Sequence, residues 1–269
     1  MNFIPSHTRA ERSLVAINLI GFGTIVRKEV RRVLRIWVQT IIPPAIAMTL
    51  YFIIFGSLIG RRIGNMDGVP YTTFMAPGLI MMSVINNSFG NVVSSFFSGK
   101  LQLHLEEMLV SPLSNVTIVL GYVVGGVVRG LLVAALVTVV AMFFTDLYLV
   151  HVWLTLATVL LTAMTFSVAG LINAIFAKNF DEISIIPTFV LQPLTYLGGV
   201  FFSISSLSPF WQHLARINPI LYMVNAFRYG MLGQSDIHIG VAFGIIVAAL
   251  LGLFAFALVL LYRGTGIRS

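Results

Sequence analysis

The chain has 269 residues, of which 58% are hydrophobic and only 9% are charged. Soluble domains carry charge on about a quarter of their residues, so the composition excludes an ordinary water-soluble protein and predicts a polytopic membrane protein. The net charge of +7 does not indicate nucleic-acid binding, because the basic residues flank the apolar runs, where they suit anionic lipid head groups.

A helix with two contrasting faces is expected near the N-terminus, over residues 22–37. Residues 1–20 lack the apolar core and cleavage site of a signal peptide and are expected to form a cytoplasmic arm. The helix is expected to lie in the membrane interface with its basic face toward lipid phosphates; the alternative is a basic flank that only orients the first span. The apolar stripe consists of Phe22, Val26, Val30, Val33 and Trp37. The basic face consists of Arg27, Lys28, Arg31, Arg32 and Arg35.

Six membrane-spanning helices are expected next, which makes the predicted fold all-α. At a rise of about 1.5 Å per residue, each is long enough to cross a hydrocarbon core of about 30 Å with some tilt. An even number of spans places both termini on one side, and the seven Lys and Arg residues of the N-terminal arm predict that this side is cytoplasmic, although the internal loops alone favour the reverse. The spans are predicted near residues 37–59, 72–97, 117–144, 152–177, 184–203 and 239–262.

Two connecting regions have features of their own. The loop at about 98–116 is charged and holds Glu106 and Glu107, two of the nine acidic residues in the chain. The region at about 204–233 is moderately apolar and rich in proline and aromatic residues, so it is expected to form short re-entrant helices on the outer face; an ordinary external loop is the alternative. The predicted parts are the arm with its interfacial helix, the six-span domain and a cytoplasmic tail, at 1–36, 37–262 and 263–269.

Polar side chains inside the predicted spans are candidates for function. The second span carries Ser83, Asn87, Asn91 and Ser94 on one helical face, which either lines a translocation path or forms hydrogen bonds between helices. Arg129 is the one charge expected within a span. Near the midplane it would contact an anionic head group, whereas it would snorkel to the cytoplasmic surface if residues 113–122 are interfacial.

Small and hydroxyl-bearing residues also follow helical spacing in the third and fourth spans. Both sets predict helix packing rather than a specific function. The third span has two pairs of small residues four apart, Gly121 with Gly125 and Gly126 with Gly130. The fourth span has a threonine face formed by Thr155, Thr158, Thr162 and Thr165.

The sequence predicts no catalytic residue and no metal site. There is no HExxH motif, no GxSxG motif, no complete phosphate-binding loop and no cysteine, and the five histidines are scattered. The protein is therefore expected not to be an enzyme by itself. All nine acidic residues fall outside the predicted spans, whereas transporters driven by protons or sodium usually keep a carboxylate at membrane depth. The energy for transport is therefore expected from a separate subunit.

The order of these elements resembles the type-2 permease family of ATP-binding cassette (ABC) exporters, and in particular the bacterial group whose ATPase is a separate subunit. The resemblance covers nearly the whole chain. It rests on the N-terminal amphipathic helix, on EEMLVSPLS at Glu106–Ser114 and on INPILYMVNAFRYGMLG at Ile217–Gly233. One departure is that Leu103 and His104 stand where the family often has a Gly-Thr pair.

The resemblance implies a permease subunit that moves a lipid, glycan or drug-like molecule outward across the inner membrane. Its implied partners are a cytosolic ABC ATPase that binds ATP and Mg, a second permease copy and membrane lipids. If the 98–116 loop is helical, the residues expected to couple it to the ATPase are Leu101, Leu105, Glu106, Glu107, Met108 and Leu109. The expected translocation path is Ser83, Asn87, Asn91 and Arg129. An ATP-independent uniporter or channel, or a purely structural subunit, is the alternative.

Overall fold

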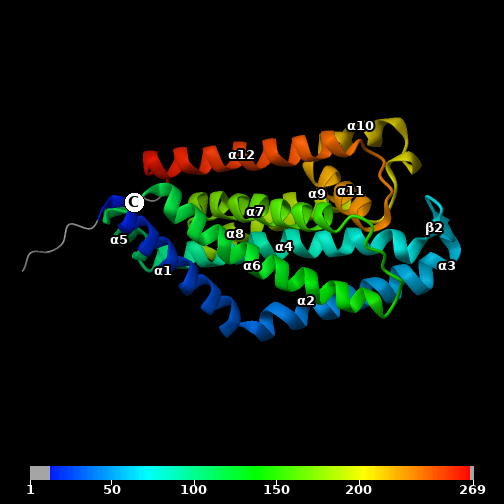
Figure 1. Ribbon diagram of the computed structural model, residues 1–269, viewed down its shortest axis with the longest axis horizontal. Coiled ribbons are helices and arrows are strands. Elements are labelled where there is room, and N and C mark those ends of the chain that lie inside the picture. The colour runs from blue at the N-terminus through cyan, green and yellow to red at the C-terminus, as the bar shows by residue number, and fades with distance from the viewer. Residues whose placement is uncertain (1–12, 267–269) are drawn as a thin grey trace, which may run out of the picture.

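Long helices run side by side along the length of the molecule in the computed structural model, which describes residues 13–266 (Figure 1). The first half contains α1 (Leu14–Arg35), α2 (Trp37–Tyr51) continued by a π-helix (Phe52–Ile59) and α3 (Gly60–Ile63), the hairpin strands β1 (Asn65–Met66) and β2 (Val69–Pro70), α4 (Tyr71–Leu101), α5 (His104–Val110) and α6 (Asn115–Met142). The second half contains α7 (Val152–Phe176), α8 (Phe180–Ile186) continued by a π-helix (Pro187–Leu191) and α9 (Gln192–Tyr196), a 3-10 turn (Ile204–Ser206), α10 (Pro209–Ile217), α11 (Pro219–Leu232) and α12 (Ile239–Arg263).

The two ends of the molecule differ in what they contain. One end holds α5, the starts of α1 and α6 and the end of α12, and is called the basal end below (Figure 1). The opposite end holds α3, the β1–β2 hairpin and α10, and is called the distal end. Both ends of the described chain therefore lie at the basal end, as an even number of crossings requires.

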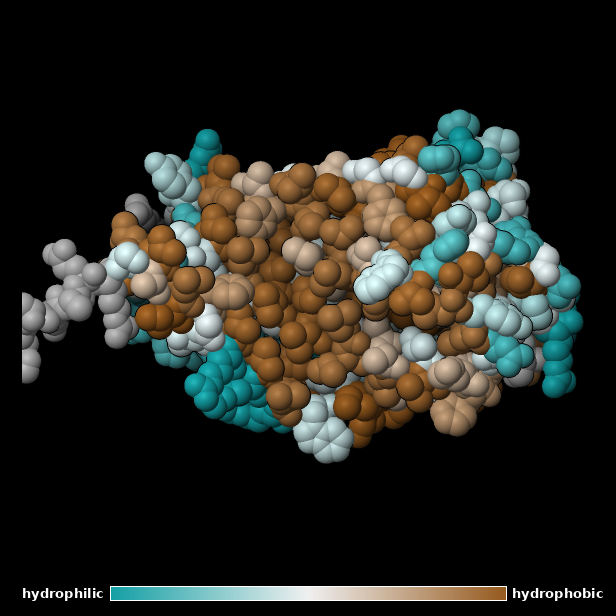
Figure 2. All heavy atoms as spheres, in the orientation of Figure 1, coloured by the Kyte–Doolittle hydropathy of each residue, from teal (hydrophilic) through white to brown (hydrophobic). Residues whose placement is uncertain are grey.

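Four helical segments among residues 13–266 are long and apolar enough to cross a membrane. They are Trp37–Ile63, Asn115–Met142, Val152–Phe176 and Ile239–Arg263. Each matches a predicted span to within a few residues. Figure 2 shows that hydrophobic side chains form a broad belt across the middle of the visible face, while hydrophilic side chains gather at the two ends. The all-α membrane fold predicted from the composition is confirmed.

The two other predicted spans differ from these four in polarity or in length. α4 has 31 residues but carries many polar side chains, and it packs against α6, α7 and α11, which shield most of its length. The span predicted at 184–203 corresponds to a helix that begins earlier, at Phe180, and ends at Tyr196. The chain then reaches Gly199, whose φ of 74° is left-handed. Glycine adopts this backbone conformation at little energetic cost, and a residue of this kind commonly follows the end of a helix. The helix therefore ends seven residues before the predicted end of the span at residue 203.

The N-terminal helix is longer than predicted, and its buried face overlaps the predicted apolar stripe only in part. α1 begins at Leu14, where the Ser13 side chain caps the helix by accepting a bond from the Ala16 N–H. The buried residues are Ile25, Glu29 and Val33, four residues apart, and of these only Val33 belongs to the predicted apolar stripe. Hydrophobicity alone defines the predicted stripe, whereas packing against α6 determines which residues of α1 are buried. Within the stripe Phe22, Val26 and Val30 are only half-buried, and Trp37 is exposed and begins α2.

The glycines of α6 make the close helix contacts that their spacing predicts. A side chain at Gly121 or Gly125 would collide with Ile25 or Glu29 of α1. A side chain at Gly126 or Gly130 would collide with serines of α7 and α4, respectively Ser167 and Ser88. One pair therefore faces the N-terminal helix and the other faces the central helices. The threonine face predicted for packing is also buried, at Thr155, Thr158, Thr162 and Thr165.

The region between the last two long helices contains the short helices that were expected. α10 lies at the distal end, and α11 turns back alongside α4, α7 and α12 (Figure 1). α11 starts with a capping contact in which the Asn218 side chain accepts a bond from the Ile220 N–H, and Pro219 occupies the first helical position. Its buried residues include Met223, Asn225 and Arg228.

We expect Gly170→Ala to destabilise the protein, because a methyl carbon there would lie 2.5 Å from the backbone oxygen of Phe89 in α4. Crowding of this kind costs about 1–3 kcal/mol. Gly252→Ala in α12 is the matched control, since nothing lies within 4 Å of that position. Thermal unfolding in detergent should show a lower midpoint for the first variant only, and equal midpoints would contradict the tight contact between α4 and α7.

Candidate functional site at the basal end

α5 is a short helix that the protein core holds in place at the basal end. It follows α4 through a tight turn in which Leu103 has a left-handed backbone, with φ of 61°. Only Leu105 of α5 is fully buried, and it lies in the same apolar cluster as Phe96 of α4 and Ile118 of α6. α5 is therefore anchored between the two helices that it connects.

The predicted coupling residues fall into three groups. Leu101, Glu106 and Glu107 are exposed, whereas Met108 and Leu109 are half-buried. Leu105 faces the core of its own chain, so this predicted coupling residue does not lie on the outer surface of α5. Val110 is 88% exposed and was not among the predicted residues. The outer surface of α5 therefore combines two carboxylates with an exposed valine.

Polar contacts fasten α1 to the segment between α5 and α6. The side-chain oxygen of Asn18 accepts hydrogen bonds from the Ser114 N–H and the Thr117 hydroxyl, both at 2.8 Å. Ser114 in turn caps α6 by accepting a bond from the Thr117 N–H. Leu113 packs against Gly21 of α1. The starts of α1 and α6 therefore form one unit with the loop that follows α5.

Lys100 makes a second connection at this end. Its ammonium group donates hydrogen bonds to the backbone oxygens of Ile175 and Ala177, both at 2.8 Å. These oxygens belong to the C-terminal turn of α7, where carbonyl groups lack partners within the helix and favour a positive charge. The end of α4, immediately before α5, is therefore bonded to the end of α7.

A carboxylate lies fully buried between α1, α4 and α6. Glu29 of α1 accepts a hydrogen bond of 2.6 Å from the Ser95 hydroxyl of α4, and its other oxygen lies 3.4 Å from Nε of Arg32. The Arg32 guanidinium donates two bonds of 2.8 Å to the backbone and side-chain oxygens of Asn91, and one of 3.3 Å to Ser94. We call these five residues the α1–α4 polar network.

The position of Glu29 corrects one argument from the sequence. Glu29 packs on Gly125, ten residues after the start of α6, which is about 15 Å along that helix. No acidic residue belongs to a predicted span, but α1 lies along the spans and brings a carboxylate among them. The absence of acids within the spans therefore does not exclude an ion-driven transporter. What the contacts do show is a carboxylate already paired with a serine and an arginine.

The predicted path residues divide between two environments. Asn91 and Ser94 bind Arg32, whereas the Ser83 hydroxyl and the Asn87 amide donate to backbone oxygens of α4 itself. Arg129 of α6 is half-buried and lies within electrostatic range of Arg32, and its Nε has no partner among the described residues. Arg32 is paired with Glu29, whereas Arg129 forms no ion pair with a carboxylate among the described residues, so the two arginines carry an excess positive charge suited to an anionic group. No group of three metal-ligating side chains occurs in residues 13–266.

Glu29→Gln should destabilise the packing of α1, because the Arg32 guanidinium would lose its carboxylate while remaining partly buried. The expected cost is about 1–3 kcal/mol. When Glu29→Gln is combined with Ser95→Ala, the loss of stability should be less than the sum of the two single losses, because the two residues share one hydrogen bond. Unfolding by SDS titration measures both effects, with Asp146→Asn on an exposed loop as the control. Strictly additive losses would show that the Glu29–Ser95 bond contributes nothing.

Comparison with known proteins supplies the family. Residues 21–232 match the model of the ABC-2 type transporter. The chain is 53% identical to the inner membrane transport permease YadH of Escherichia coli (strain K12) over 251 residues, which cover 93% of this chain and 98% of the relative. It is 26% identical to nodulation protein J of Rhizobium meliloti (strain 1021) over 196 residues, which cover 72% and 75% of the two chains.

These matches confirm the resemblance that the sequence motifs indicated. The family match includes α5 and all of α11, and it begins within α1. The relationship to YadH extends over nearly the full length of both chains. The chain therefore belongs to the ABC-2 type transporter family and is a multi-pass permease subunit of the inner membrane.

Proposed function

We propose that this chain is the membrane subunit of an ATP-driven exporter and that a separate cytosolic ATPase docks at the basal end. The ATPase would bind ATP and Mg, and the permease itself would catalyse no reaction. The observation that carries the proposal is α5, which exposes Glu106, Glu107 and Val110 while Leu105 anchors it in the core. A helix exposed on one side and anchored on the other can pass a displacement from a docked partner into the membrane helices.

The contacts around α5 give that displacement a defined route. The Asn18 bonds fasten α1 to the loop after α5, and Lys100 fastens the end of α4 to the end of α7. A partner that moves α5 would therefore move α1, α4 and α6 together rather than distort a flexible loop. This supports coupling through the whole basal end.

We further propose six crossings with both termini in the cytoplasm. α4 is about 46 Å long and can cross the bilayer because its neighbours shield its polar side chains. Phe180–Tyr196 is about 25 Å long and would complete its crossing through residues 197–203, which lie beside α11. The basic residues exposed on α1 near the basal end support a cytoplasmic location for that end.

A second copy of the permease is proposed to complete the pathway. Midway along α4, its own chain leaves a polar edge half-covered at Asn86 and Asn87, next to the exposed Gly90. Polar groups are costly to expose to lipid, so this edge requires protein or water beside it. Two copies that face each other through this edge would enclose a polar path that includes Asn87, while lipids cover the apolar outer faces.

The proposed substrate is an amphipathic or hydrophobic molecule of the lipid, glycan or drug class, moved outward. The unpartnered Nε of Arg129 and the excess positive charge near Arg32 support a substrate with an anionic head. An ATP-independent uniporter or channel is the competing function, and the two are separated by whether flux requires the ATPase and ATP.

Docking at α5 is tested by purifying the tagged protein in mild detergent and assaying ATPase activity in the retained complex. We expect the unaltered protein to retain an ATPase subunit. The double variant Glu106→Ala/Glu107→Ala should retain at least tenfold less of this subunit. Asp181→Ala, an exposed acid at the start of α8, is the control and should retain the partner. A homo-oligomer without a nucleotide-hydrolysing partner would instead favour the uniporter or channel.

The role of Arg129 is tested by ATP-dependent flux in proteoliposomes that contain the purified complex. Arg129→Leu should lower flux about tenfold, because one charge-assisted contact with the anionic head is worth about 1.5–3 kcal/mol. Arg129→Lys should keep most of the flux, and both variants should still retain the ATPase. Full activity of Arg129→Leu would show that Arg129 only reaches the surface and does not contact the substrate.

A further inference from the structure

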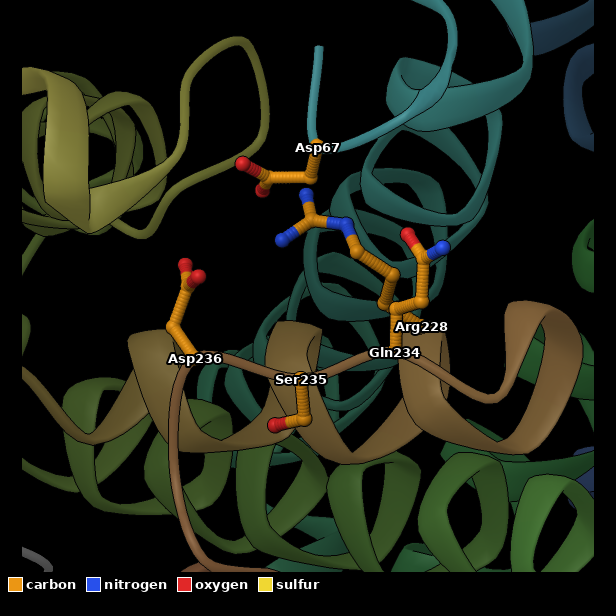
Figure 3. A pocket seen from close by; sticks show the side chains of 5 residues that line it. All are labelled: Asp67, Arg228, Gln234, Ser235 and Asp236. Carbon is orange, nitrogen blue, oxygen red and sulfur yellow. The ribbon is translucent and has the colours of Figure 1, made fainter.

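A small polar cavity lies at the distal end, far from the coupling helix. Its volume is about 150 Å³, and it is lined by Asp67, Arg228, Gln234, Ser235 and Asp236. These residues come from the turn of the β1–β2 hairpin, from α11 and from the segment before α12 (Figure 3). Nothing in the proposed coupling or transport function uses them.

Arg228 is held rigidly in the wall of this cavity. Its side chain is buried, one terminal nitrogen donates a 2.6 Å bond to the Gly199 oxygen, and the guanidinium lies over the ring of Phe74 at 3.9 Å. Its Nε is buried and has no hydrogen-bond partner among the described residues. The guanidinium lines the cavity, where an oxygen acceptor on a ligand would complement an N–H donor that Gly199 does not use.

Two carboxylates in the cavity wall provide negatively charged hydrogen-bond acceptors, whereas Arg228 provides positively charged donors. Figure 3 shows the Arg228 guanidinium projecting toward Asp67, with Asp236 across the cavity. Asp236 is oriented by bonds from the Ser203 hydroxyl and the Ile204 N–H, whereas no hydrogen bond to the Asp67 carboxylate occurs among the described residues. Two carboxylates against one guanidinium leave the cavity with a net negative charge, which favours a cation and disfavours a ligand that is purely anionic.

The size and surroundings of the cavity narrow the ligand further. Its volume equals that of about five water molecules and is well below that of a typical drug-sized pocket. Gln234 and Ser235 also line a neighbouring cavity of about 550 Å³, whose other walls include Tyr229, Ile237 and Ile239. That cavity leads to the start of α12, whose outward side chains Val241, Val247 and Leu251 are apolar and exposed.

We propose that this cavity binds the head group of a phospholipid that carries a primary ammonium beside its phosphate, as in phosphatidylethanolamine. The ammonium lies between Asp67 and Asp236, a phosphate oxygen accepts from Arg228, and the acyl chains follow the apolar side of α12. A quaternary ammonium has no N–H to donate to the carboxylates, so phosphatidylcholine binds less well. Phosphatidylglycerol lacks the ammonium and carries a net negative charge, so it is disfavoured as well.

The test is native mass spectrometry of the purified permease in detergent after exposure to an equimolar mixture of dioleoyl phosphatidylethanolamine, phosphatidylcholine and phosphatidylglycerol. We expect preferential retention of phosphatidylethanolamine, and about a tenfold loss of that preference in Asp67→Asn, because a charge-assisted contact is removed. Asparagine tolerates the left-handed backbone of Asp67, whose φ is 49°, so the hairpin is preserved. Gln234→Ala should reduce retention more weakly.

Asp146→Asn, at an exposed acid in the loop between α6 and α7, is the matched control and should retain the lipid preference. Equal retention of the three lipids by the unaltered protein, or an unchanged preference in Asp67→Asn, would overturn the proposal. A further measurement adds free O-phosphoethanolamine, the head group without its acyl chains. If it occupies the cavity as readily as the intact lipid, the lipid assignment is wrong. The experiment uses neither ATP nor an ATPase, so its failure leaves the proposed transport function untouched.

Discussion

The structure depends on one constraint: within a bilayer, a polar group must find its partner inside the protein. α4 is the clearest case, because it carries serines and asparagines along a length that must lie among lipid-covered helices. It tolerates them because α6, α7 and α11 surround it. Those neighbours approach closely where side chains are absent, at Gly126 and Gly130 of α6 and at Gly170 of α7. The small residues therefore make the polar central helix possible.

The same logic explains how an interfacial helix becomes part of the bundle. Gly121 and Gly125 open a groove on α6 that admits Ile25 and Glu29 of α1. Glu29 is tolerated there because Ser95 and Arg32 satisfy it, and the arginine is itself fixed by α4. The contact is thus specific, since a wholly apolar stripe could slide along α6 whereas this network fixes one register. A helix fixed in this way responds as a unit when the basal end moves.

The sequence predicted what depends on local pattern and missed what depends on distant partners. Apolar runs placed four spans to within a few residues, and glycine spacing correctly predicted close contacts. The burial of Glu29 was missed because its glycine partner lies almost a hundred positions away in the chain. One signal was available, since Glu29 is the single acid among the basic residues of Arg27–Arg35. Burial of Leu105 was missed for a related reason, because the cluster that buries it is formed with residues of other helices, such as Phe96 of α4 and Ile118 of α6.

Two buried or half-buried arginines attach peripheral elements to the same central helix, one in each of its halves. Arg32 joins α1 to α4 near the basal end, through Asn91 and Ser94. Arg228 joins α11 to α4 near the distal end, through the ring of Phe74, while it also holds the Gly199 oxygen. Because α4 is packed along its length, displacement of one end is resisted by contacts at the other. A movement that begins at α5 is therefore expected to reach the distal end as a rigid shift of α4, and not as a local change that dissipates within one turn.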